Sequence, residues 1–143
     1  MLNPIIYHLI LAAICGYALW RGQFDERVTA TVCVVATLAT RLALSPTAQR
    51  YSSVEVGVLI VDAVTFFAFA LVALRSERFW PLWVSGLQLT TTMAHFMKAI
   101  DANLFPQAYA AAGRFWGYPI LLILAIGAHR TSVRSRQSSA IST

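Results

Sequence analysis

The sequence predicts an all-α protein, a polytopic transmembrane helical bundle of five spans with its N-terminus outside and its C-terminus inside. Of the 143 residues, 58% are hydrophobic and 12% are charged, which is more apolar surface than one soluble core of this size can bury. The apolar residues come in runs that approach the roughly 20 residues needed to cross a bilayer. The basic residues lie between and after these runs, which is typical of a membrane protein with basic cytoplasmic loops.

The spans are expected at about residues 4–20, 28–44, 54–74, 79–98 and 107–128. Together they form a transmembrane domain over residues 1–129, joined by short polar connections such as the charged loop 21–27. Pro4 and Pro81 fall in first helical turns, where the missing N–H of proline costs nothing. Aromatic residues open the fourth span, where a membrane interface favours them.

The fifth run is the least regular, and a four-span bundle is the alternative. Residues 115–128 alone are too short to cross about 30 Å of hydrocarbon. Extending the run back to Gln107 supplies the length but places Arg114 inside it and Pro119 in its middle, which predicts a kink near Phe115. Residues 130–143 are rich in serine and arginine and are expected to form a disordered basic cytoplasmic tail.

The basic residues set the orientation. With the N-terminus outside, seven of the eleven Lys and Arg residues lie on the cytoplasmic side: Arg21, Arg27, Arg75, Arg78, Arg130, Arg134 and Arg136. The outer connections then contain Arg50 and Lys98, and this asymmetry favours an external N-terminus and a cytoplasmic C-terminus. The net charge of +5 therefore reflects topology, and no nucleic-acid partner is expected.

Polar side chains recur inside the apolar runs, on the side of the expected bundle that faces outside. In the fourth run, Gln88, Thr91, His95 and Lys98 share one helical face. The whole candidate cluster comprises His8, Arg41, Asp62, Thr91, His95, Lys98 and Arg114. Such groups are costly in hydrocarbon, so they are expected to face one another in the outer half of the bundle, with little comparable in the inner half. Asp62 is expected to pair with Arg41 or Arg114, because a buried unpaired charge is expensive.

Three functions fit this cluster. The first is a non-catalytic accessory or assembly subunit of a membrane complex. Its partners would be the lipid bilayer and other membrane protein subunits. No catalytic residue is assigned, because the sequence contains no cofactor or nucleophile motif. The second is a small transporter or channel component for protons or small ions, although no continuous polar route reaches the cytoplasm.

The third function is a redox carrier, and the cofactor stays open. Haem b could be held axially by His8 and His95. A divalent metal could instead use His8, His95 and Asp62, although these residues lack the local spacing of a metal motif. Cys15 and Cys33 are expected to be packing thiols, since no CxxC pattern surrounds them.

A segment at the start of the fourth run resembles a known group of proteins. Arg78, Phe79, Trp80, Pro81, Leu82 and Trp83, followed by His95, Lys98 and Asp101, are similar to uncharacterised small polytopic membrane proteins of α-proteobacteria. The resemblance extends over most of the chain. It implies a location in a bacterial inner membrane and implies no activity, cofactor or substrate.

Overall fold

The structure, a computed structural model, describes residues 4–43, 56–100 and 115–141. These ranges contain five helices and no strand, so the all-α class is confirmed for the described residues. The helices are α1 (Pro4–Arg21), α2 (Phe24–Ala43), α3 (Val56–Arg75), α4 (Trp80–Ile100) and α6 (Gly117–Ile141).

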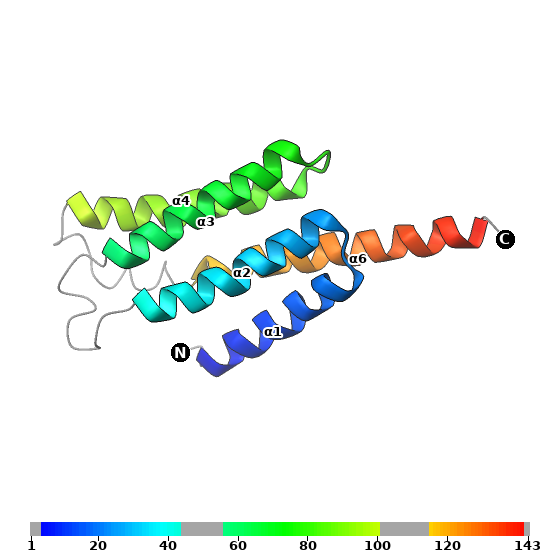
Figure 1. The fold of residues 1–143 in the computed structure, drawn as a ribbon, viewed down its shortest axis with the longest axis horizontal. Helices are drawn as coiled ribbons and strands as arrows, with labels where there is room; N and C mark the ends of the chain where they lie inside the picture. The colour runs from blue at the N-terminus through cyan, green and yellow to red at the C-terminus, as the bar shows by residue number, and fades with distance from the viewer. Residues whose placement is uncertain (1–3, 44–55, 101–114, 142–143) are drawn as a thin grey trace.

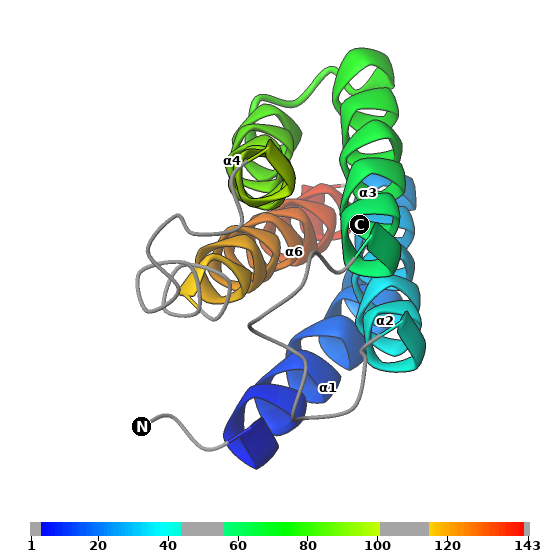
Figure 2. The ribbon, with the colours of Figure 1, turned by 90° about the vertical axis from the view of Figure 1, so that its left-hand side faces the viewer.

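Among the described residues, two helical hairpins and one further helix make up the bundle. α1 pairs with α2 and α3 with α4, each through a short turn, and both turns lie at the same end of the molecule (Figure 1). We call this the turn end and the other the open end. α2 packs against α3, and α6 runs beside α1, α2 and α4, so that it lies between α1 and α4 (Figure 2). Successive described helices alternate in direction, and the N- and C-termini therefore lie at opposite ends (Figure 1).

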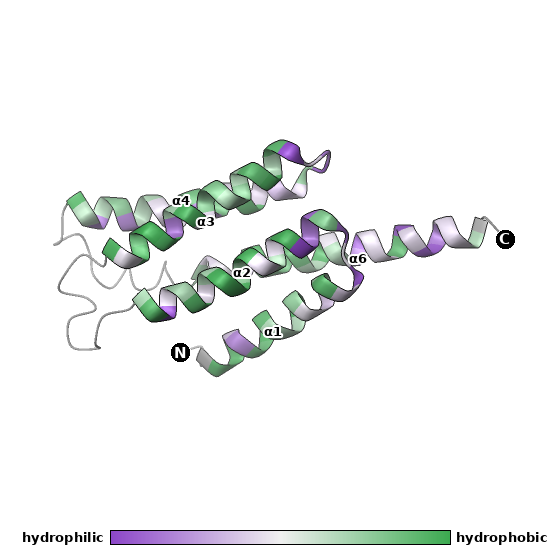
Figure 3. Cartoon of the chain, viewed as in Figure 1, coloured by the Kyte–Doolittle hydropathy of each residue, from purple (hydrophilic) through white to green (hydrophobic). Residues whose placement is uncertain are grey.

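Length and composition identify one candidate membrane span among the described helices, where the sequence analysis expected five. α3 is long and apolar enough to cross a bilayer, and a second apolar helix, Ile5–Arg21, is shorter. The remaining helices carry polar residues that lower their average hydropathy. α2 begins with charged residues, α4 contains the polar stripe, and α6 ends in a basic segment (Figure 3).

The connection between α1 and α2 is shorter than the loop predicted at residues 21–27. Only Gly22 and Gln23 separate the two helices, and the acidic residues Asp25 and Glu26 belong to the first turn of α2. The backbone N–H of Gln23 donates to Oε2 of Glu26 at 3.0 Å. This is the side-chain contact of a capping box, in which the third helical residue caps the start of its own helix. Two carboxylates near a helix N-terminus also interact favourably with the helix dipole.

α6 differs from the expected fifth span at both ends. It begins at Gly117, which puts Pro119 in its first turn, where proline is tolerated, instead of at a kink within a span. Residues 107–114 lie outside the described residues. At its other end α6 continues as helix to Ile141, over residues for which composition predicts a disordered tail. Residues 133–140 are all exposed, so this extension buries little of its surface.

Small side chains fill much of the core. Its buried residues are Leu11, Cys15, Ala18, Ala30, Cys33, Phe69, Val84, Ile120, Leu121, Leu124 and Ala128, and both cysteines are free thiols. Small residues let helices approach closely. At Gly127, for example, an added Cβ would lie 3.2 Å from the ring of Trp80, so glycine there allows α4 and α6 to pack together. Many of the large apolar side chains instead lie on the outer surface.

Gly22 is required by the α1–α2 turn. A Cβ at this position would lie 2.6 Å from Cβ of Glu26 and still closer to the carbonyl oxygen of Ala18. Gly22→Ala should therefore lower the free energy of unfolding by about 1–3 kcal/mol through overpacking, measured by thermal unfolding in detergent. Gly86→Ala is the matched control, because nothing lies within 4 Å of its added Cβ. In a helix that change should raise stability by about 0.5–1 kcal/mol. Equal stability of the two variants would contradict this role of Gly22.

Candidate functional site

Polar side chains of the described residues meet in three places. One lies at the turn end and two lie toward the open end. We call them the turn-end network, the Asp62–His95 cluster and the His8–Arg41 pair.

The turn-end network is built around the carboxylate of Glu26, which is 0% exposed. Its Oε1 accepts hydrogen bonds from the guanidinium of Arg78 and, at 2.6 Å, from the hydroxyl of Thr131. Arg78 also donates to that hydroxyl and, at 2.6 Å, to Oε1 of Gln23. Glu26 belongs to α2, Arg78 to the α3–α4 turn and Thr131 to α6. One buried ion pair therefore joins three separate parts of the chain.

A second contact reinforces this junction. The hydroxyl of Ser76 donates to Oδ2 of Asp25 at 2.6 Å and accepts from the backbone N–H of Arg78 at 3.1 Å. From the sequence, little polarity was expected inside the bundle at this end, and Arg78 was not expected to bind a buried acid. The spacing of Gln23 and Glu26, which suits a capping interaction, was the available sign that residues 21–27 are not a simple loop.

The Asp62–His95 cluster joins α3 to α4. Nε2 of His95 lies 2.9 Å from Oδ2 of Asp62, and the two side chains are 13% and 14% exposed. Nε2 of Gln88 donates to Oδ1 of Asp62 at 3.2 Å, and the hydroxyl of Thr92 donates to the backbone carbonyl of Asp62 at 3.2 Å. Three polar side chains of α4 thus gather around Asp62 of α3.

The polar stripe predicted on the fourth span is only partly in this cluster. Gln88 and His95 belong to it, but the hydroxyl of Thr91 donates to the carbonyl of Leu87 in its own helix, at 3.3 Å. Lys98 is only 4% exposed and lies in the last turn of α4, where a cation interacts favourably with the helix dipole.

The His8–Arg41 pair joins α1 to α2. Nη2 of Arg41 lies 2.9 Å from Nε2 of His8. A guanidinium can only donate, so the imidazole nitrogen accepts this hydrogen bond and carries no proton. The ring of Tyr7 packs edge-on against His8 and against Tyr118 of α6, with centroids 5.5 and 5.4 Å apart. His8 is half-buried and Arg41 is exposed.

These contacts correct one of the two pairings expected for Asp62, the one with Arg41. Among the described residues the side chain of His95 lies against Asp62, and Arg41 is bonded to His8 instead. The reason is the arrangement of the helices. Asp62 lies on α3 and contacts α4, whereas Arg41 lies on α2 and contacts α1, so the two side chains belong to different hairpins. Arg114, the other expected partner, lies outside the described residues, and its pairing with Asp62 stays a prediction.

The structure also separates the two histidines considered for haem. His8 is on α1 and His95 on α4, with α6 between these helices (Figure 2), and each histidine contacts another side chain. Within residues 4–43, 56–100 and 115–141, no three His, Cys, Asp or Glu residues come together as a metal site would require. Asp62 and His95 could contribute two ligands to a metal.

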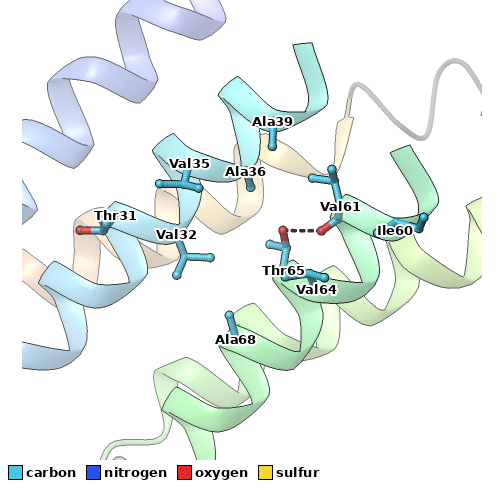
Figure 4. Close-up of a pocket in the computed structure, with 10 residues that line it drawn as sticks. All are labelled: Thr31, Val32, Val35, Ala36, Ala39, Ile60, Val61, Val64, Thr65 and Ala68. Atoms are coloured by element: carbon cyan, nitrogen blue, oxygen red, sulfur yellow. Dashed lines mark hydrogen bonds between the residues drawn. The ribbon is translucent and has the colours of Figure 1, made fainter. Parts of the chain in front are cut away.

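An apolar pocket of about 300 Å³ lies between α2 and α3 (Figure 4). Its walls are aliphatic apart from two threonines, and neither hydroxyl is free. Thr31 donates to the carbonyl of Arg27 at 2.8 Å and Thr65 to that of Val61 at 2.7 Å. The pocket therefore offers a ligand van der Waals contact and no polar group.

Comparison of the chain with protein-family models, curated proteins and solved structures finds no match. The polar contacts described above therefore carry the functional assignment.

The turn-end network makes a clear prediction about stability. Arg78→Met would leave the carboxylate of Glu26 buried without its cation, and should cost about 3–5 kcal/mol of unfolding free energy. Arg75→Met is the control, since Arg75 is an exposed arginine three residues away and its replacement should change little. Adding Glu26→Gln to Arg78→Met should restore part of the loss. If thermal unfolding in detergent gives the same midpoint for Arg78→Met and Arg75→Met, the ion pair does not hold this end together.

Proposed function

We propose that this chain is an integral membrane protein of five transmembrane helices, with its N-terminus outside and its C-terminus in the cytoplasm, and that it serves as a non-catalytic accessory or assembly subunit of a membrane complex. One observation carries the proposal. Each polar site in the described residues links helices of the bundle to one another, while large apolar side chains cover the outside.

The outer surface of α3 supports a membrane location. Five large apolar side chains lie exposed along it at helical spacing: Ile60, Val64, Phe67, Leu71 and Leu74. Water disfavours a continuous exposed stripe of this kind, whereas lipid or a partner helix would cover it. A subunit of a membrane complex needs such a surface for both contacts.

The threonines give independent support. Five of them donate their hydroxyls to the carbonyl four residues earlier in the same helix: Thr31, Thr37, Thr65, Thr90 and Thr91. This bond satisfies a hydroxyl without water. It is the form in which threonine is tolerated within hydrocarbon, where each unsatisfied polar group costs several kcal/mol.

The orientation follows from the alternating helices and the charges. Arg21, Arg75 and Arg78 all belong to the turn end, and α6 continues beyond that end with Arg130, Arg134 and Arg136. A basic turn end favours the cytoplasmic side. The open end, with the His8–Arg41 pair, then faces outside.

A second candidate function is a component that handles protons or small ions, and the Asp62–His95 contact favours it. Ionisable residues within membrane spans often mark ion or proton pathways. The haem alternative has less support, because His8 and His95 belong to helices that are separated by α6.

Reporter fusions test the topology. A reporter that is active only in the periplasm should give no activity when fused after Thr143 or inserted after Glu77, and should give activity when inserted after Gln49. The asymmetry of basic residues is the physical reason. Activity at Thr143 and none at Gln49 would reverse the orientation, and equal activity at Glu77 and Gln49 would contradict the third span.

His95→Gln separates the subunit function from the proton-handling one. Glutamine can still donate to Asp62, but it does not titrate between about pH 5 and 8 as histidine does. The tagged chain should migrate on a native gel, from mild detergent, in an assembly larger than its own 15.7 kDa and its detergent. The same assembly should persist in His95→Gln. Proton uptake into vesicles that is present in the wild type and lost in His95→Gln would favour the second function instead. So would a wild-type chain that migrates on the native gel at the size of the single chain in its detergent.

A further inference from the structure

We propose that Arg41 and His8 form a binding site for a phosphate group at the open end of the bundle, supplied either by a phospholipid headgroup or by the free anion. The anion site itself is argued from the described contacts. The choice of phosphate over other oxyanions, and the headgroup source, rest in addition on the proposed topology.

The described contacts of Arg41 leave its positive charge in place. A guanidinium stays protonated, and here its partner is an imidazole nitrogen acting as acceptor instead of a carboxylate. The described acids are engaged or placed elsewhere. Asp62 pairs with His95, Asp25 and Glu26 are bonded at the turn end, and Glu77 lies in the turn next to Arg78. Within the described ranges, no carboxylate neutralises Arg41.

The guanidinium also keeps hydrogen-bond donors available for an anion. It has five N–H donors in a planar fork, and His8 is the side chain that Arg41 contacts in the described part of the chain. Arg41 is exposed, so donors remain for an incoming oxyanion. His8 is in turn packed against Tyr7, whose ring meets Tyr118 of α6. Because these contacts already restrict the arginine, less conformational entropy is lost when an anion binds.

The location selects phosphate among the oxyanions. A planar guanidinium binds phosphate and carboxylate equally well in geometric terms. Arg41 lies in the last turn of α2 and His8 in the second turn of α1, so both lie at the open end. In the proposed topology this end meets the outer leaflet, where lipid phosphates are the abundant anions. Tyr7 and Tyr118 are of a residue type that is enriched at this depth.

Binding to the purified chain in a neutral detergent tests the site. The probes are a short-chain phosphatidylglycerol and inorganic phosphate, titrated separately by calorimetry. Arg41→Gln should weaken binding by about tenfold or more, as expected for lost hydrogen bonds from a charged donor. Arg41→Lys should give an intermediate loss, because it keeps the charge without the fork. Arg75→Gln is the matched control, because Arg75 is likewise exposed in the last turn of a helix, α3, but lies at the turn end. The Arg75→Gln variant should bind both probes with the affinity of the wild type.

Competition distinguishes the two sources. Displacement of the lipid by inorganic phosphate would identify phosphate itself as the ligand, and binding of the lipid alone would identify the headgroup; both support the site. The site would be overturned if neither probe bound, or if wild type, Arg41→Gln and Arg41→Lys bound with equal affinity. It would also be overturned if Arg75→Gln lost as much affinity as Arg41→Gln. If Arg41→Gln does not fold, Arg41→Lys decides alone. The measurement requires no partner subunit, so its failure leaves the subunit function standing, and the native-gel result does not affect the binding result.

Discussion

The ion pair between the buried carboxylate of Glu26 and the guanidinium of Arg78 is the interaction on which the rest of the bundle depends. A carboxylate without access to water is strongly unfavourable unless cationic and hydroxyl donors surround it. Here those donors come from Arg78 and Thr131, and the second oxygen caps α2 by accepting from Gln23. The carboxylate therefore ties the two turns and α6 to one another. The sharp α1–α2 turn, which only glycine at position 22 allows, follows from the same requirement.

The two ends of the bundle are consequently held in different ways. At the turn end, polar contacts cross between the hairpins, from Glu26 to Arg78 and from Asp25 to Ser76. Toward the open end, the described polar contacts stay within a hairpin, His8 with Arg41 and Asp62 with His95. The hairpins meet there through aliphatic side chains, beside the apolar pocket between α2 and α3 (Figure 4).

The sequence alone predicted the helical class and the approximate positions of α1, α3 and α4, because long apolar runs and proline positions are local signals. It also predicted that Gln88 and His95 share a face. It did not predict that His95 is the partner of Asp62, since partner choice depends on the order of helices around the bundle, which periodicity does not contain. Glu26 was missed for a related reason. Its charge placed it in a loop by composition, whereas a capping contact and two distant partners place it in a helix.

Polar and apolar side chains lie on different faces of α4, so its mean hydropathy is lower than the hydropathy of its exposed face. Gln88, Thr92 and Lys98 are buried, and His95 faces Asp62. The exposed side of the same helix carries Leu89, Met93, Phe96, Met97 and Ile100. An average over all faces mixes these two groups, so α4 falls short of the hydropathy of a membrane span although its outward surface is largely apolar. Polar residues facing inward and apolar residues facing outward are what a lipid-exposed helix requires. The exposed face of a helix, and not its mean composition, is therefore the quantity that bears on the five-span proposal.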